Sequence, residues 1–119
     1  MVIVDFKKRK TAEQKEEKEK EKAWSEDIRS SAGWVCSICG SPNRLHAHHI
    51  IPREHERFKF DLENGIALCA KHHKFCRNIS AHNNPMAFFL WLQKYHYVKF
   101  ITAVENTKKL LLVKEGIEV

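Results

Sequence analysis

The 119-residue sequence lacks a long hydrophobic run, an export signal and any internal repeat. The longest apolar stretches are Met86 to Leu92 and Leu110 to Val113, and both are far shorter than the roughly 20 residues that span a bilayer. Residues 1–6 lack the basic start and the long apolar stretch of a signal peptide. We therefore expect no membrane partner and a cytoplasmic location.

The chain contains four cysteines. Four cysteines allow two disulfides, but disulfides persist in oxidising compartments and no export signal is present. Cys36 and Cys39 are separated by two residues, a spacing typical of metal binding in a reducing compartment. We therefore expect metal-bound cysteines instead of disulfides.

The composition indicates one small, charged domain. Hydrophobic residues make up 43% of the chain and charged residues 30%, which allows a modest core at a length typical of a single domain. The net charge of +6 favours a polyanionic partner such as nucleic acid. We divide the chain into a charged N-terminal helix over residues 1–32, a turn-rich core over 33–84 and a helical cap over 85–119.

Residues 7–22 carry eight basic side chains and five glutamates. A charge run of this kind usually forms a solvated helix surface. The alternative is that the four basic residues at positions 7–10 bind a phosphate backbone. Trp24 and Ile28 lie four residues apart and share one helical face, so we expect them to pack this helix on the core.

The core is expected to be a strand–loop–strand–helix unit. Leu45 to Ile51 and Ile66 to Cys69 are predicted to be strands, and Ala70 to Asn78 a helix. Pro85 suits the first turn of another helix. The apolar stripe of that helix is expected to pack inward and comprises Phe88, Phe89, Trp91, Leu92 and Tyr95.

A last helix is predicted from Val98 to Lys109, with Phe100, Ile101 and Val104 facing inward. Leu110 to Val113 is either a terminal strand or the end of that helix. Short strands combined with separate helices place the fold in the α+β class.

Four soft ligands occur as two close pairs, Cys36 with Cys39 and Cys69 with His72. Two local pairs can surround one tetrahedral Zn²⁺, and the bound ion would contribute directly to folding. His72 is favoured by the two-residue gap that it shares with the first pair, and the alternative ligand is Cys76, one helical turn further on. The alternative to a zinc site is that these cysteines are ordinary buried hydrophobes.

The order of residues from about Trp34 to Lys74 resembles the His-Asn-His (HNH) endonuclease family. The similarity rests on the first cysteine pair, the His48-His49-Ile-Ile-Pro segment, Asn64 and the closing segment from Cys69 to His73. The resemblance implies a zinc-stabilised ββα-metal fold that hydrolyses DNA phosphodiester bonds with a divalent metal ion. The family usually closes with a second CxxC pair, whereas here a histidine takes the last position.

The resemblance also implies a role for each remaining motif residue. His49 falls on the general base, and an unperturbed imidazole titrates near neutral pH. His48 and His73 fall on the ligands of the catalytic ion. We expect Mg²⁺ or Mn²⁺ there, with Ni²⁺ or Zn²⁺ as alternatives because both ligands are imidazoles. Asn64 is expected to tie the loop together and orient His49, and Gly65 to permit a tight turn into the second strand.

The two histidines of each adjacent pair are expected to have different roles. Neighbouring strand residues point to opposite faces, which separates His48 from His49. Successive helical residues point about 100° apart, which separates His72 from His73. His46 shares a strand face with His48 and is the best candidate to support a metal ligand from behind.

Arg53 and Lys71 are the candidate phosphate contacts, and the remaining histidines receive no role: His55, His82 and His96. Residues 80–91 resemble the tail that follows the motif in small bacteriophage-type HNH proteins, which implies a phage source and the host cytoplasm. One chain carries one site, so nicking of DNA is the default expectation. The alternatives are a non-cutting, zinc-stabilised nucleic-acid-binding module and a structural zinc protein of a phage packaging assembly.

Overall fold

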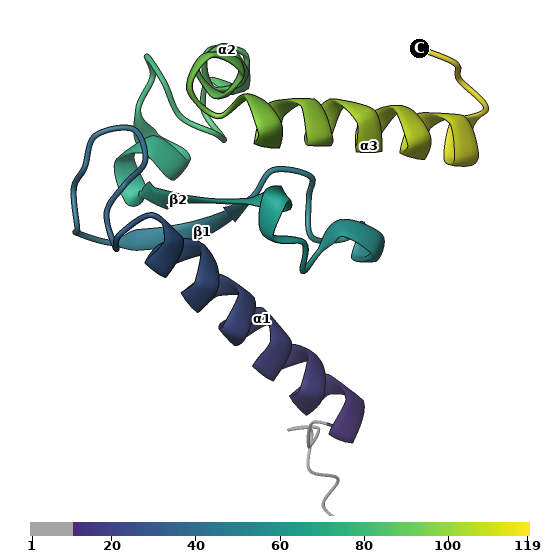
Figure 1. Ribbon diagram of the computed structural model, residues 1–119, viewed down its shortest axis with the longest axis horizontal. Helices are drawn as coiled ribbons and strands as arrows, with labels where there is room; N and C mark the ends of the chain where they lie inside the picture. Colours follow the sequence, from purple (N-terminus) through teal and green to yellow (C-terminus); the bar gives the residue numbers. More distant parts are fainter. Residues whose placement is uncertain (1–10) are drawn as a thin grey trace, which may run out of the picture.

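The computed structural model describes residues 11–119, so the basic residues at positions 7–10 lie outside the described part of the chain. A two-stranded sheet occupies the middle of the molecule, with α1 on one side and α2 and α3 on the other (Figure 1). The elements in chain order are α1 (Ala12–Ser31), β1 (Leu45–His49), η1 (Glu56–Phe58), η2 (Leu62–Asn64), β2 (Gly65–Cys69), η3 (Lys71–Phe75), α2 (Pro85–Tyr95) and α3 (Tyr97–Glu115). Within residues 11–119, no helix is both long and apolar enough to cross a membrane.

Helix α1 begins at a capping box and is attached to the sheet near its other end. The Thr11 hydroxyl accepts a hydrogen bond from the Gln14 backbone N–H, and the Gln14 side chain accepts one from the Thr11 N–H. Trp24 and Ile28 are buried and pack with Ala67 of β2. The predicted docking of the charged helix through these two side chains is therefore confirmed.

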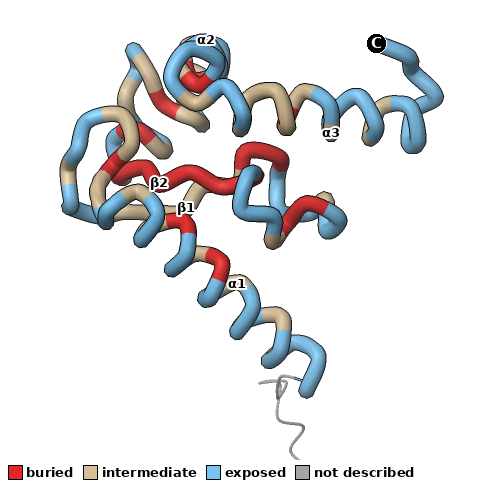
Figure 2. Tube along the Cα trace, viewed as in Figure 1, coloured by how far each residue is buried: buried red, intermediate tan, exposed pale blue. Residues whose placement is uncertain are grey.

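The strands pair antiparallel, with Leu45 opposite Cys69 and His49 opposite Gly65. β2 is buried along its whole length, whereas every residue of β1 is half-buried (Figure 2). The first strand was predicted to reach Ile51 but ends at His49. It stops there because the Ile51 N–H donates to the Asn64 side chain and leaves the strand ladder.

The prediction of a helix over Ala70 to Asn78 is wrong in its length. The chain forms one wide π-type turn, η3, and leaves it at Cys76. The N–H groups of residues 81 and 82 donate to the carbonyls of His72 and His73 at 2.9 and 3.0 Å. These bonds fold the following loop back over η3, where a longer helix would otherwise continue.

Helices α2 and α3 cover the face of the sheet opposite α1. Asn84 caps α2 by accepting from the Ala87 N–H, and Phe88 and Leu92 of α2 are buried in the main core. Phe89 and Tyr95 are exposed, so the predicted apolar stripe is narrower than expected. Leu110 to Val113 belongs to α3, whose inner residues Phe100, Ile101 and Val104 are half-buried.

Candidate active site and metal clusters

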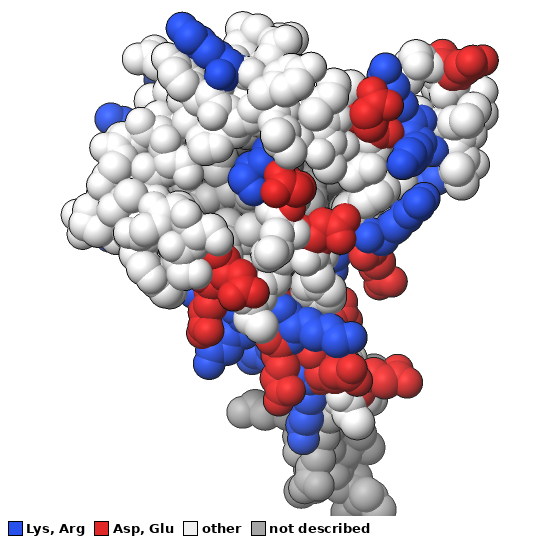
Figure 3. Space-filling model, in the orientation of Figure 1, with Lys and Arg blue, Asp and Glu red and all other residues white. Residues whose placement is uncertain are grey.

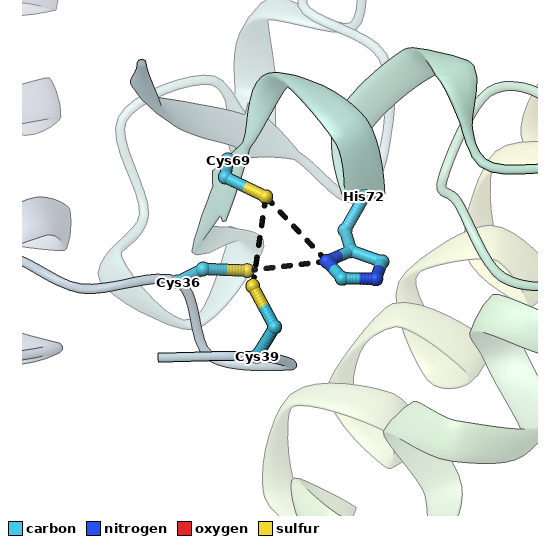
Figure 4. Close-up of side chains that lie close together, drawn as sticks. All are labelled: Cys36, Cys39, Cys69 and His72. Atoms are coloured by element: carbon cyan, nitrogen blue, oxygen red, sulfur yellow. Dashed lines mark hydrogen bonds between the residues drawn. The ribbon is translucent and has the colours of Figure 1, made fainter. Parts of the chain in front are cut away.

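Three sulfurs and one imidazole meet where the Cys36–Gly40 turn touches η3. The Nδ1 of His72 lies 3.7 Å from the Cys36 Sγ and 3.4 Å from the Cys69 Sγ, and the Sγ atoms of Cys39 and Cys69 are 3.8 Å apart (Figure 4). Ligands that share one tetrahedral Zn²⁺, at about 2.3 Å for sulfur and 2.1 Å for nitrogen, lie roughly 3.4–3.8 Å apart. This Cys₃His group therefore has the composition and spacing of a structural zinc site, and Cys76 lies outside it.

Backbone hydrogen bonds hold the first cysteine pair in place. The Gly40 N–H donates to the Cys36 carbonyl, and the Ser37 N–H donates to the carbonyl of Ala67 on β2. Burial disfavours the Cys36 thiolate, but nearby backbone N–H groups, among them that of Ile38, outweigh it and lower the pKa of Cys36. The surroundings of Cys36 thus favour the thiolate that a zinc ion requires, whereas burial, with Cys39 and Cys36, raises the pKa of Cys69.

A second group of potential ligands consists of His48, His73 and His82, whose ligand nitrogens all lie within 4.8 Å of one another. His73 is central: its Nε2 is 3.1 Å from the His82 Nε2, and its Nδ1 is 2.9 Å from the His46 Nδ1. The two histidines expected as ligands therefore lie together, with His46 beside them. His82 was given no role from the sequence, because nothing in its local pattern predicts that the loop after η3 folds back.

The imidazoles of His48 and His73 are held in the neutral form that binds metal ions. Burial, reinforced by His73, His82 and His49, lowers the pKa of His48 to about 3. Burial, reinforced by His82 and His46, lowers the pKa of His73 to about 4. Both rings are therefore uncharged at neutral pH.

The expected separation of His48 from His49 is present in the structure. The His48 ring packs edge-on against Phe88 of α2, with 5.7 Å between ring centroids. The His49 ring faces α1 and stacks on Trp24 at 4.0 Å with an interplanar angle of 11°. The strand alternation thus turns one histidine toward the metal-type group and the other toward α1.

A backbone carbonyl orients the His49 ring. The His49 Nε2 lies 3.0 Å from the Lys59 carbonyl oxygen, which can only accept, so Nε2 carries the hydrogen. In the neutral ring Nδ1 is then the atom that can take up a proton. Burial lowers the pKa of His49, against the opposing effect of the Lys59 carbonyl.

Asn64 ties the loop between the strands together. It is buried, its Oδ1 accepts from the Ile51 N–H at 2.7 Å, and its Nδ2 donates to the carbonyls of Ile51 and Phe58 at 3.1 and 3.2 Å. None of these bonds reaches His49. Asn64 instead fixes the Phe58 carbonyl, and the carbonyl of the next residue, Lys59, holds the His49 ring.

One hollow of about 640 Å³ is lined by His48, His49, His73 and His82 together with three charged residues: Arg53, Glu54 and Lys74. Arg53 forms an ion pair with Glu21 of α1 at 3.3 Å. Lys71 lines a different hollow, beside Cys39 and Cys69. Lys74 was missed from the sequence, although its position next to His73 was a usable signal.

The comparison with protein families decides what this arrangement represents. A family model described as HNH endonuclease matches residues 36–75. The match covers 40 of the 119 residues and supports membership of the HNH endonuclease family. The HNH segment contains the four Cys₃His ligands, the His48-His49 pair, Asn64 and His73, whereas His82 lies beyond it. Nothing matched among curated proteins or among solved structures.

Family membership sets the general chemistry. HNH proteins are nucleases that act on DNA with divalent metal ions, and the small mixed fold with its Cys₃His group agrees with a zinc-stabilised ββα domain. The resemblance inferred from the motif and the expected fold class are therefore both confirmed.

Proposed function

We propose that this protein is a metal-dependent endonuclease that hydrolyses DNA phosphodiester bonds and nicks one strand at a time. The observation that carries the proposal is the single hollow that His49, His48 and His73 all line. A phosphodiester in this hollow would lie between a candidate general base and a candidate cation site. Hydrolysis requires both.

His49 is the proposed general base. Its Nδ1 removes a proton from a water molecule, whose oxygen then attacks phosphorus while the bond from phosphorus to the 3′ oxygen breaks. The products end in 5′-phosphate and 3′-hydroxyl, with a solvent proton completing the hydroxyl. The Lys59 carbonyl and the Trp24 ring keep the imidazole in the orientation that this step needs.

His48 and His73 are the proposed ligands of the catalytic divalent ion, and their neutral nitrogens fit that role. When bound, this ion supplies charge stabilisation for the phosphate and the leaving oxygen. We assign the Cys36, Cys39, Cys69 and His72 group to a structural zinc, since a closed set of four protein ligands leaves no position for substrate.

A few basic side chains near the hollow are the proposed phosphate contacts. On the face shown in Figure 3, basic and acidic side chains are interspersed along α1, so the positive charge there does not form one continuous patch. Arg53 and Lys74 line the hollow and are best placed to meet the scissile phosphate. Lys71 lines the neighbouring hollow. Its phosphate contact stays a prediction, and the phosphate would be one farther from the cleaved bond.

A plasmid assay tests the proposal. Supercoiled DNA is incubated with the protein in Mg²⁺, Mn²⁺, Ni²⁺ or Zn²⁺, and open-circular product should form before linear product. His49→Ala should be inactive, whereas His55→Ala, at a half-buried histidine outside the hollow, should cut normally. DNA binding without cutting in every metal would instead favour the non-cutting nucleic-acid-binding module. Absence of DNA binding at low salt would favour a structural role in a packaging assembly.

A further inference from the structure

We infer that His82 is a third protein ligand of the ion at His48 and His73, and that the completed site selects imidazole-preferring transition ions such as Ni²⁺, Co²⁺ or Zn²⁺ over Mg²⁺. The inference rests on the metal site of the proposed function and extends it to a residue beyond the matched family segment.

The distance between His73 and His82 fits a shared ion. Two nitrogens at about 2.1 Å from one metal ion, with bond angles of roughly 90–110°, lie about 3.0–3.4 Å apart. The two Nε2 atoms are 3.1 Å apart. His48 is also close, with 5.3 Å between its ring centroid and that of His82. The ligand nitrogens of all three rings lie within 4.8 Å of one another, which makes them candidates to share one ion.

The loop that carries His82 is held by its own hydrogen bonds. The N–H groups of Ala81 and His82 donate to the carbonyls of His72 and His73. Ser80 is fully buried, and its hydroxyl accepts from the Asn83 N–H at 2.9 Å. A ligand on such a braced turn loses little freedom when it binds, which favours binding.

His46 supports this assembly from behind. Its Nδ1 lies 2.9 Å from the Nδ1 of His73. When His73 donates through Nδ1, its Nε2 keeps the lone pair that faces His82 and the proposed ion. Metal-bound histidines commonly use the second ring N–H in this way, and the partner fixes the tautomer. His46 is therefore a positioning residue.

The donor set determines the class of ion. The group offers three imidazole nitrogens and no carboxylate, and Glu54 lines the same hollow without belonging to the group. Imidazole suits Zn²⁺, Ni²⁺ and related ions, whereas Mg²⁺ prefers oxygen ligands. Because His82 is exposed and the site opens onto the hollow, positions remain for water and a phosphate oxygen.

The same 3.1 Å distance would also suit a metal-independent N–H···N hydrogen bond, and metal binding distinguishes the two. Full-length protein that retains its tightly held zinc is titrated with Ni²⁺ and, separately, with Mg²⁺. Heat and the visible absorption of bound Ni²⁺ are the readouts. His82→Ala should weaken Ni²⁺ binding by at least about tenfold, since loss of a supporting residue alone typically costs that much. The matched control, His55→Ala, should bind Ni²⁺ like the wild type.

The outcomes separate this inference from the nuclease proposal. Unchanged Ni²⁺ affinity in His82→Ala, with weaker binding in His48→Ala and His73→Ala, would overturn the third ligand and leave a two-histidine site. No Ni²⁺ binding by the wild type, or Mg²⁺ binding of equal strength, would overturn the ion preference. If Ni²⁺ binds through all three histidines but DNA is not cut, the inference stands and the nuclease proposal fails. Because His82 is exposed, His82→Ala should keep the wild-type melting temperature.

Discussion

The two ligand groups of this small domain share the turn η3 but differ in every property that decides their use. The Cys₃His group has three sulfurs and a buried histidine, His72. The three-histidine group has no sulfur, includes the exposed His82, and opens onto a hollow. Closed sets of four ligands are typical of structural zinc, and open sets are typical of catalytic ions. One short turn therefore joins the proposed stabilising centre to the proposed reactive one.

The division depends on two adjacent residues. His72 presents Nδ1 to the sulfurs, and His73 presents Nε2 to His82. Side chains of successive residues in a helical turn point in different directions, so neighbours can serve different centres. Loss of a ligand from the Cys₃His group should thus have a different consequence from loss of a ligand from the three-histidine group.

Loss of the closed group should have the largest effect. Cys36→Ser removes a thiolate from the Cys₃His group, and bound zinc in small domains contributes on the order of 10 kcal/mol to folding. We expect the variant to lose its zinc and its cooperative melting transition, as measured by metal analysis and circular dichroism. Cys76→Ser, outside the group, is the matched control and should retain both. Wild-type melting behaviour in Cys36→Ser would show that the group does not stabilise the fold.

Loss of the general base should leave the closed group intact. His49→Ala removes the proposed proton acceptor, and general-base loss typically reduces the rate by about 10²–10⁴-fold. Zinc content and DNA affinity should stay at wild-type values, as measured by metal analysis and gel shift. A variant that nicks plasmid at the wild-type rate would refute the assignment of His49.

The smallest effect is expected at the edge of the open group. Glu21→Gln removes the ion pair that competes with DNA for Arg53. Exposed ion pairs contribute about 0.2–1 kcal/mol, so DNA should bind roughly one- to fivefold more tightly in a fluorescence anisotropy titration. Glu16→Gln makes the same charge change on α1, at a residue paired with Lys20 instead. An equal gain in both variants would mean that net charge, and not Arg53, is responsible.

Local patterns predicted the closed group, and the resemblance to the HNH family predicted His48 and His73 of the open one. The two-residue gaps identified the Cys₃His set, and the strand alternation separated His48 from His49. Both depend only on residues close in sequence. His82 could not be found in this way, because its position depends on backbone hydrogen bonds from residues 81 and 82 to the carbonyls of η3.

Packing between elements that are distant in the sequence could not be predicted either. Gly65 was expected to permit a tight turn, but its φ of −127° suits any residue. The structure requires glycine there because a Cβ would lie 2.4 Å from the Ile28 Cδ1 of α1. Likewise, the stack of Trp24 on His49 joins residues from α1 and β1 that no local spacing connects.

The central claim is that neighbouring histidines on η3 serve two separate metal ions. Its most direct test is zinc content per chain and plasmid cleavage rate, measured on His72→Ala and His73→Ala. His73→Ala should keep its zinc and its melting temperature but stop cutting. His72→Ala should lose zinc and melt at a lower temperature, with activity falling only as the fold loosens. The claim would be contradicted if His72→Ala kept its zinc while Cys76→Ser lost it, or if His73→Ala lost its zinc.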